Sequence, residues 1–193
     1  MLSSSELDLL EEVLSQNKDL IDIGFDNPDN GIMEDITNSV LMKDYEDIQI
    51  YKSLKVSDSL YDTYITIVGI TYSLTKGKYP ARYSENQVIG LKKLSRNYGH
   101  IFIRPETFED KVSELFIKSE IDFPEFPKFS FRYYCLADDE IKAKSFANPD
   151  RLRFIEKQNE ILIDVNGDVL IAKFSRIITY DDFNCMLEFI KSI

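Results

Sequence analysis

The chain has 193 residues, 44% of them hydrophobic, and its 34 acidic and 23 basic residues give a net charge of −11. This length suits a single domain, and the hydrophobic content excludes an intrinsically disordered chain. The negative charge disfavours binding to nucleic acid or to an anionic membrane, because both present phosphate groups. We therefore expect one globular domain over residues 1–193 that binds neither.

The first part of the sequence predicts two helices and a strand. Ser3 and Glu6 form a capping box that opens a helix over 3–16, where leucines recur on one face. Apolar residues over 32–41 indicate a second helix. The run 64–74 is rich in β-branched and aromatic residues, which is typical of a buried strand.

The middle of the chain predicts a helix followed by a strand. Ser84 and Gln87 form a second capping box, which predicts a helix over 84–98. Gly99 would end this helix, because glycine adopts the left-handed conformation found after many helices. Residues 100–104 then predict a short strand.

Further elements follow in the second half of the sequence. A helix is expected over 107–116 and a strand over 129–136, with two short helices over 138–146 and 150–158. Along the expected strand Phe129, Phe131, Tyr133 and Cys135 would share one face, because side chains alternate.

A hairpin and a final helix complete the prediction. Asn166-Gly167 joins the apolar runs 160–165 and 168–174, and this dipeptide is a strong hairpin signal because it tolerates positive φ. Thr179 is expected to cap the last helix. Together the elements predict an α+β fold, with an antiparallel or mixed sheet of about five strands packed with several helices.

Charge is distributed unevenly along the chain. Residues 1–75 carry fifteen acids and four bases, whereas residues 76–104 carry seven bases and one acid. The basic segment can pair with the acidic segment inside the fold, which is the interpretation we favour, or it can form an anion site or a partner surface.

The basic segment is also the best candidate for a functional surface. Its bases alternate with tyrosines, and the expected helix start at Ser84 would attract anions through its free N–H groups. Such a combination can hold a phosphate or a carboxylate. The candidate ligand or partner surface consists of Lys78, Tyr79, Arg82, Tyr83, Lys92 and Arg96.

The sequence predicts no catalytic residues, no metal site and no cofactor. His100 is the only histidine, which excludes multi-histidine zinc sites, and a Cys–His dyad would need it beside Cys135 or Cys185. Both cysteines are expected to be buried and inert. The nucleophile elbow, phosphate-loop and dinucleotide motifs are missing from the sequence. The acidic turn 26–31 lacks the oxygen ligands that calcium needs at two positions.

The expected location is the cytoplasm. Two cysteines far apart in the sequence do not make a disulfide framework, which suits a reducing compartment, and the N-terminal residues do not resemble a secretory signal. The longest apolar stretch, over 64–72, is too short for the roughly 20 residues of a membrane-spanning helix.

About a quarter of the chain, over 129–170, resembles an uncharacterised bacterial domain family of unknown function. The shared pattern is an aromatic strand, an Asp turn, an Ala-containing helix and a short hairpin. The resemblance implies a bacterial origin and an α+β fold, and it implies no functional residues. The matching positions are Phe129, Phe131, Arg132, Tyr133, Tyr134, Asp138, Ala143, Leu152, Ile161, Ile163, Asn166, Gly167 and Leu170.

Three functional hypotheses follow from these observations. The first is a non-enzymatic binding protein whose acidic surface meets a basic protein partner, in the manner of a small immunity or accessory protein. The alternative is a small-molecule or anion-binding protein, or an enzyme, that uses the basic loop around residues 76–96. The third is a subunit that self-associates by pairing its acidic and basic segments.

Overall fold

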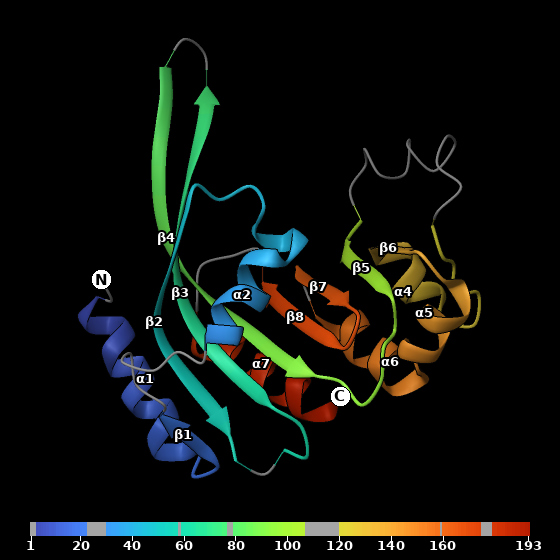
Figure 1. Cartoon of the computed structure of the whole chain (residues 1–193), viewed down its shortest axis with the longest axis horizontal. Helices are drawn as coiled ribbons and strands as arrows, with labels where there is room; N and C mark the ends of the chain where they lie inside the picture. The colour runs from blue at the N-terminus through green and yellow to red at the C-terminus, as the bar shows by residue number, and fades with distance from the viewer. Residues whose placement is uncertain are drawn as a thin grey trace.

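The computed structural model describes residues 3–22, 30–57, 59–76, 79–106, 120–158, 160–174 and 179–193. It contains one sheet of eight strands in the order β1-β2-β3-β4-β8-β7-β5-β6, and neighbouring strands are antiparallel throughout (Figure 1). The α+β class is therefore confirmed, whereas the expected number of about five strands is wrong. The strands are β1 (Leu20–Asp22), β2 (Asp47–Val56), β3 (Thr63–Lys76), β4 (Tyr79–Lys93), β5 (His100–Pro105), β6 (Tyr133–Ala137), β7 (Ile161–Asn166) and β8 (Val169–Phe174).

Helices lie on both faces of this sheet. On the described residues they are α1 (Ser4–Gln16), α2 (Asn30–Asn38), the short 3-10 helix η1 (Val40–Met42), α4 (Pro127–Arg132), α5 (Glu140–Phe146), α6 (Pro149–Lys157) and α7 (Tyr180–Ser192). Within these residues no helix is long and apolar enough to cross a membrane.

The larger core lies on the face covered by α1, α7 and the helices α4 to α6. It joins residues such as Ile163 and Ala172 of the sheet to Phe146 and Phe189 of the helices. α7 contacts β3, β4 and β8, and it approaches the sheet closely at Gly90. A Cβ atom at Gly90 would lie 2.7 Å from the Met186 sulfur, so this contact depends on glycine.

A smaller core lies on the opposite face, beneath α2 and η1. Ile36 and Met42 pack there against Val68, Ile70 and Ile89 of β3 and β4. This cover leaves part of the face open. The open part carries the cavity described below, which residues of β3 to β8 line.

The helix expected over 84–98 is wrong, because these residues belong mainly to β4. The strand pairs with β3 along its whole length, from Lys76↔Tyr79 to Thr63↔Lys92. Its residues 87–92 are buried on both faces of the sheet, so they lack the alternation of apolar and polar residues that marks a half-exposed strand. Long-range pairing thus overrides a local capping pattern at Ser84.

β3 and β4 continue beyond their neighbours as a projecting hairpin (Figure 1). β2 pairs with β3 only as far as Thr71, and β8 pairs with β4 only from Ile89 onward. Arg82, Tyr83 and Leu74 are exposed on this hairpin. Most of the basic segment therefore lies along an extended strand and its projecting end.

The strand expected over 129–136 is partly wrong. Pro127 starts the helix α4, a position where proline loses no hydrogen bond, and the strand β6 begins only at Tyr133. Phe129 is fully buried in α4, whereas the side chain of Phe131 is 71% exposed. The four residues expected on one strand face therefore do not share it.

The expected hairpin and last helix are confirmed, with one shift in the turn. Asn166 still pairs with Val169, so the turn residues are Gly167 and Asp168, and only Gly167 has positive φ, at 65°. A glycine at the first turn position suits a tight two-residue hairpin. Thr179 caps α7 in a capping box with Asp182.

Most other expected elements agree with the structure. The helices expected near 3–16, 32–41, 138–146 and 150–158 correspond to α1, α2 with η1, α5 and α6. The strands expected over 64–74 and 100–104 correspond to β3 and β5. The helix expected over 107–116 and most of the acidic turn lie outside the described residues.

Candidate functional site

The described members of the predicted binding surface are spread along the structure and are not gathered into one site. Lys78 lies outside the described residues, and Tyr79 starts β4. Arg82 and Lys92 lie ten positions apart on this strand, a separation of about 33 Å at the rise of an extended chain. The expected helix start that would attract an anion is part of the strand, so that component of the prediction is wrong.

Several of these bases have partners within the fold. The Arg82 guanidinium lies 3.4 Å from the Glu46 carboxylate. Lys93, which follows the predicted residue Lys92 in the chain, lies 3.2 Å from the Asp35 carboxylate. Among the described residues, internal pairing between the basic and acidic segments therefore occurs at these two places.

The remaining predicted residues are held separately. Buried Lys92 donates to the backbone oxygen of Ile190 at the end of α7, at 2.9 Å. Arg96 donates to the Ser145 hydroxyl, and Tyr83 stacks on Tyr72 with ring centroids 5.7 Å apart.

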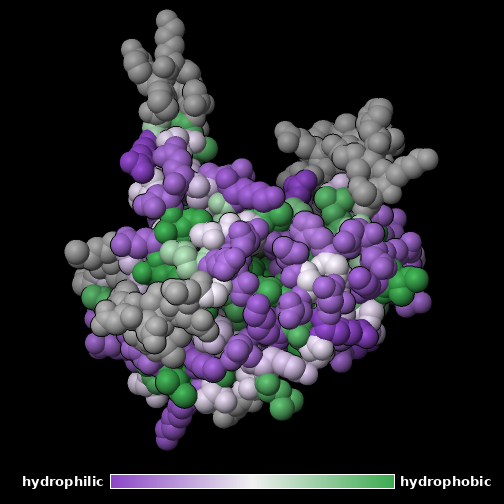
Figure 2. Space-filling model, in the orientation of Figure 1, coloured by the Kyte–Doolittle hydropathy of each residue, from purple (hydrophilic) through white to green (hydrophobic). Residues whose placement is uncertain are grey.

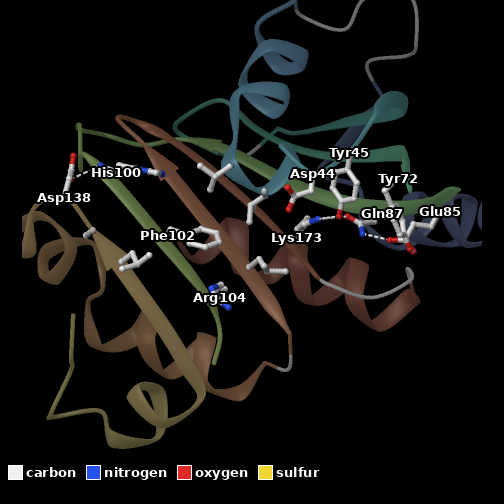
Figure 3. Close-up of a pocket in the computed structure, with 15 residues that line it drawn as sticks. Asp44, Tyr45, Tyr72, Glu85, Gln87, His100, Phe102, Arg104, Asp138 and Lys173 are labelled. Atoms are coloured by element: carbon white, nitrogen blue, oxygen red, sulfur yellow. Dashed lines mark hydrogen bonds between the residues drawn. The ribbon is translucent and has the colours of Figure 1, made fainter. Parts of the chain in front are cut away.

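The structure instead points to a cavity of about 890 Å³ on the half-covered face of the sheet (Figure 3). Residues of η1 and of the loop after it form one wall, and the strands form the floor. On the surface shown in Figure 2, hydrophilic residues dominate and small hydrophobic patches lie near the base of the β3–β4 hairpin. The cavity is lined by Val40, Leu41, Asp44, Tyr45, Tyr72, Glu85, Gln87, His100, Phe102, Arg104, Leu136, Ala137, Asp138, Leu162 and Lys173.

Lys173 is the buried cation of this cavity. Its side chain comes from β8, and the residue is only 4% exposed. The amine donates to the Tyr45 hydroxyl and to the Gln87 side-chain oxygen, the latter at 3.1 Å, and it lies 4.5 Å from the centre of the Tyr45 ring. None of the described carboxylates lies within ion-pair distance of this amine.

Burial changes the proton affinity of this amine. Desolvation lowers the pKa of Lys173 from 10.5 to about 8, while the more distant charges of Glu85 and Asp44 act in the opposite direction. Burial also raises the pKa of the Tyr45 hydroxyl. A lysine with a pKa near 8 is partly uncharged at neutral pH, which is the condition for reactivity as an amine.

Gln87 connects Lys173 to the acidic edge of the cavity. Its amide nitrogen donates to the Glu85 carboxylate at 2.7 Å, while its oxygen accepts from Lys173. The Tyr72 hydroxyl donates to the same carboxylate at 3.4 Å. This chain of hydrogen bonds fixes the orientation of the Gln87 amide, so its oxygen faces the lysine.

Arg104 places a second cation on the same floor. Leu162 on β7 pairs with Lys173 on β8. On the other side of β7, the register of β5 ends at the Ile103↔Ile163 pair, and the next residue of β5, Arg104, therefore lies beside Leu162. Lys173 and Arg104 are therefore separated by one strand, which corresponds to about 10 Å between backbones. The Arg104 guanidinium lies 5.1 Å from the centre of the Tyr134 ring. Phe102 lies on the same strand of the floor (Figure 3), and Leu162 is a second apolar residue that lines the cavity.

A second polar cluster is centred on the buried carboxylate of Asp164. It accepts from the Ser39 hydroxyl at 2.7 Å and from the Val40 backbone N–H at 2.9 Å, and it lies 2.9 Å from His100 Nε2. The carboxylate stands between the serine and the histidine, so the histidine does not contact the hydroxyl as a general base would. The cluster therefore attaches η1 to β7 and β5.

The cysteines do not take part in either cluster. Burial raises the pKa of Cys135 to about 12, which agrees with the expected inert thiol. Cys185 was expected to be buried as well, but it is only partly buried, and it donates to the Gln158 side-chain oxygen at 2.8 Å. His100 contacts Asp164 rather than a thiol. Across the described ranges no group of three His, Cys, Asp or Glu side chains is arranged to hold a metal.

Fold and cavity together define the chain as an α+β protein with an antiparallel sheet that is covered by helices on one face and half-open on the other. Comparison with protein-family models, with curated proteins and with solved structures finds no match to this chain. The resemblance of 129–170 to an uncharacterised family therefore stays an expectation.

Sequence reasoning missed Lys173, Tyr45 and Arg104 as members of one site. A signal for Lys173 was present, because a lysine within the apolar strand Val169–Phe174 must either be exposed or be buried with polar partners. Tyr45 and Gln87 are 128 and 86 residues away along the chain, so only the folded structure reveals those partners.

Proposed function

We propose that this chain is a binding protein whose cavity accepts a small organic acid with an apolar body. The observation that carries the proposal is the buried amine of Lys173, which faces the cavity with neutral hydrogen-bond partners only among the described residues. A ligand carboxylate would supply the charge that this amine lacks at hydrogen-bond distance.

The arrangement of charges around the cavity supports an anionic ligand. Asp44 and Asp138 are exposed at the rim, where water weakens their fields, and Glu85 already accepts two hydrogen bonds. Lys173 and Arg104 are the less exposed charges on the floor. Phe102, Leu136 and Leu162 offer apolar contact to the rest of the ligand.

A panel of small carboxylates tests this proposal by thermal unfolding. At millimolar concentration, an aromatic or branched carboxylate is expected to raise the melting temperature by a few degrees, because a ligand bound only by the folded state stabilises it. The matching alcohols or amides are expected to have no effect. Lys173→Met and Arg104→Met should each weaken binding at least about tenfold, the loss expected for one charge-assisted hydrogen bond.

Lys142→Met is the matched control, because Lys142 is exposed on α5 and does not line the cavity. It should bind the carboxylates as the unchanged chain does. If the carboxylates fail to stabilise the protein, or if they stabilise the Lys173→Met variant equally, the proposed ligand class is wrong.

The second candidate function is binding of a basic protein partner through the acidic surface. It is favoured by α1, where the side chains of Asp8, Glu11 and Glu12 are exposed and the last turn holds no basic residue. A basic partner would be attracted by this surface and released by salt.

Replacing these three acids by Asn and Gln is expected to remove any partner that is captured from native cells and eluted at moderate salt. Mass spectrometry of the eluate checks the result. The triple variant should keep the carboxylate binding described above, because α1 does not line the cavity. A partner retained equally by the variant would argue against this acidic surface.

A further inference from the structure

We infer that Lys173 is a carbonyl-reactive amine that forms an imine with an aldehyde or ketone group of a small organic acid bound in the cavity. This inference rests on the proposed function, because the same cavity must first admit the acid. It adds the chemical class of the ligand, an oxo acid, and a covalent step.

The position of the amine meets the geometric requirement for such a reaction. Lys173 comes from a central strand, between β4 and β7, so its backbone is fixed by hydrogen bonds on both sides. Tyr45 and Gln87 hold its amine at the cavity floor (Figure 3). A nucleophile positioned in this way reacts with a bound carbonyl as an intramolecular group.

The surroundings of the amine also favour its neutral form. The immediate hydrogen-bond partners are neutral, and burial lowers the pKa of Lys173 to about 8. At pH 7 roughly one amine in ten is then uncharged, against about one in 3,000 for a lysine with a pKa near 10.5. Only the uncharged amine carries the lone pair that attacks a carbonyl carbon.

The step balances without an oxidant or a reductant. The nitrogen lone pair forms the C–N bond, and the resulting carbinolamine loses its oxygen as water, which carries away the two protons of the amine. The products are an imine and one water molecule. The Tyr45 hydroxyl contacts the amine and can relay a proton from nitrogen to the departing oxygen, so Tyr45 acts as the acid–base partner.

Arg104 would select carbonyl compounds that also carry a carboxylate. It lies one strand away from Lys173 on the same floor, with Leu162 between them. A rigid molecule with a carbonyl at one end and a carboxylate at the other can therefore place its carboxylate on Arg104 and its carbonyl at the uncharged amine of Lys173, whereas a simple carboxylate pairs with the protonated amine. The guanidinium of an arginine can donate two parallel hydrogen bonds to the two oxygens of a carboxylate.

The test compares 4-formylbenzoate with benzaldehyde, two aromatic aldehydes that differ by one para-carboxylate. The full chain is incubated with each aldehyde and cyanoborohydride at pH 7, and the reduced adducts are mapped by peptide mass spectrometry. We expect one dominant adduct on Lys173, formed at least about tenfold faster than on exposed lysines because of its larger neutral fraction. We also expect 4-formylbenzoate to react faster than benzaldehyde.

Three variants make the outcome specific. Lys173→Arg should lose the dominant adduct, Tyr45→Phe should slow its formation, and Arg104→Met should remove the preference for 4-formylbenzoate. Circular dichroism of each variant confirms that it is folded. Equal rates for the two aldehydes in the unchanged chain would overturn the oxo-acid assignment.

Failure of this inference can be distinguished from failure of the proposed function. Adducts spread over exposed lysines with Lys173 unmodified would overturn imine formation, even where simple carboxylates still raise the melting temperature. If neither carboxylates nor aldehydes engage Lys173, both the proposed function and the inference are wrong.

Discussion

Replacing Lys173 by methionine is expected to increase the stability of the fold at pH 7 relative to the unchanged chain, and to lose most of this advantage by pH 10. The pKa of Lys173 is about 8 in the folded state and near 10.5 in the unfolded state. Folding therefore has to bury a charge below pH 8, which costs free energy, whereas above pH 10.5 the amine is neutral in both states. Methionine has a similar length and no charge.

The pH dependence separates this effect from ordinary packing changes. Because the unfolded state binds the proton more tightly, the stability of the unchanged chain rises with pH between 8 and 10.5 relative to the variant. The difference in free energy of unfolding should change by about 2 kcal/mol between pH 7 and pH 10. Urea unfolding of both proteins at the two pH values measures it. A difference that is the same at both values would show that the amine is not desolvated.

Replacing Asp164 by alanine is expected to have the largest destabilising effect outside the apolar core. The carboxylate accepts from Ser39, Val40 and His100, and the Ser39 hydroxyl is buried. Without it, these donors lose their acceptor and η1 loses its attachment to β7. Each unsatisfied buried donor costs about 1–3 kcal/mol, so we expect a loss of about 3 kcal/mol in the free energy of unfolding.

Two companion variants locate the cause of that loss. Asp164→Asn keeps the shape and one acceptor oxygen, so its loss should be about half as large. His100→Ala removes only the partner whose side chain is 46% exposed and should cost less than about 1 kcal/mol. An Asp164→Ala chain that unfolds at the same urea concentration as the unchanged chain would refute the role assigned to the cluster.

Local signals account for the elements that sequence reasoning predicted well. The β7–β8 hairpin depends on Gly167, and α7 begins at the Thr179 cap, and both signals act over a few residues. β4 has a local signal that points to a helix, but its pairing with fourteen positions of β3 stabilises the strand instead. Pairing of this kind depends on a distant segment and is invisible in a short window.

The candidate site was predicted less well than the fold, for a related reason. The sequence grouped the bases near Arg82 by their closeness along the chain, but an extended strand separates them. The cavity groups residues that are far apart in sequence, because β8 inserts between β4 and β7 and brings Lys173 next to Tyr45 of a much earlier loop. Chain order therefore carried little information about the site.

The alternation along β8 has a consequence for how this protein can diverge. Ala172 and Phe174 point into the larger core, and Lys173 between them points into the cavity. Inserting or deleting one residue in this strand would exchange the two faces, placing an ammonium group in the core and a phenyl ring in the cavity. Relatives of this chain are therefore expected to differ here by substitution and to keep the length of β8 constant, whatever ligand they have come to accept.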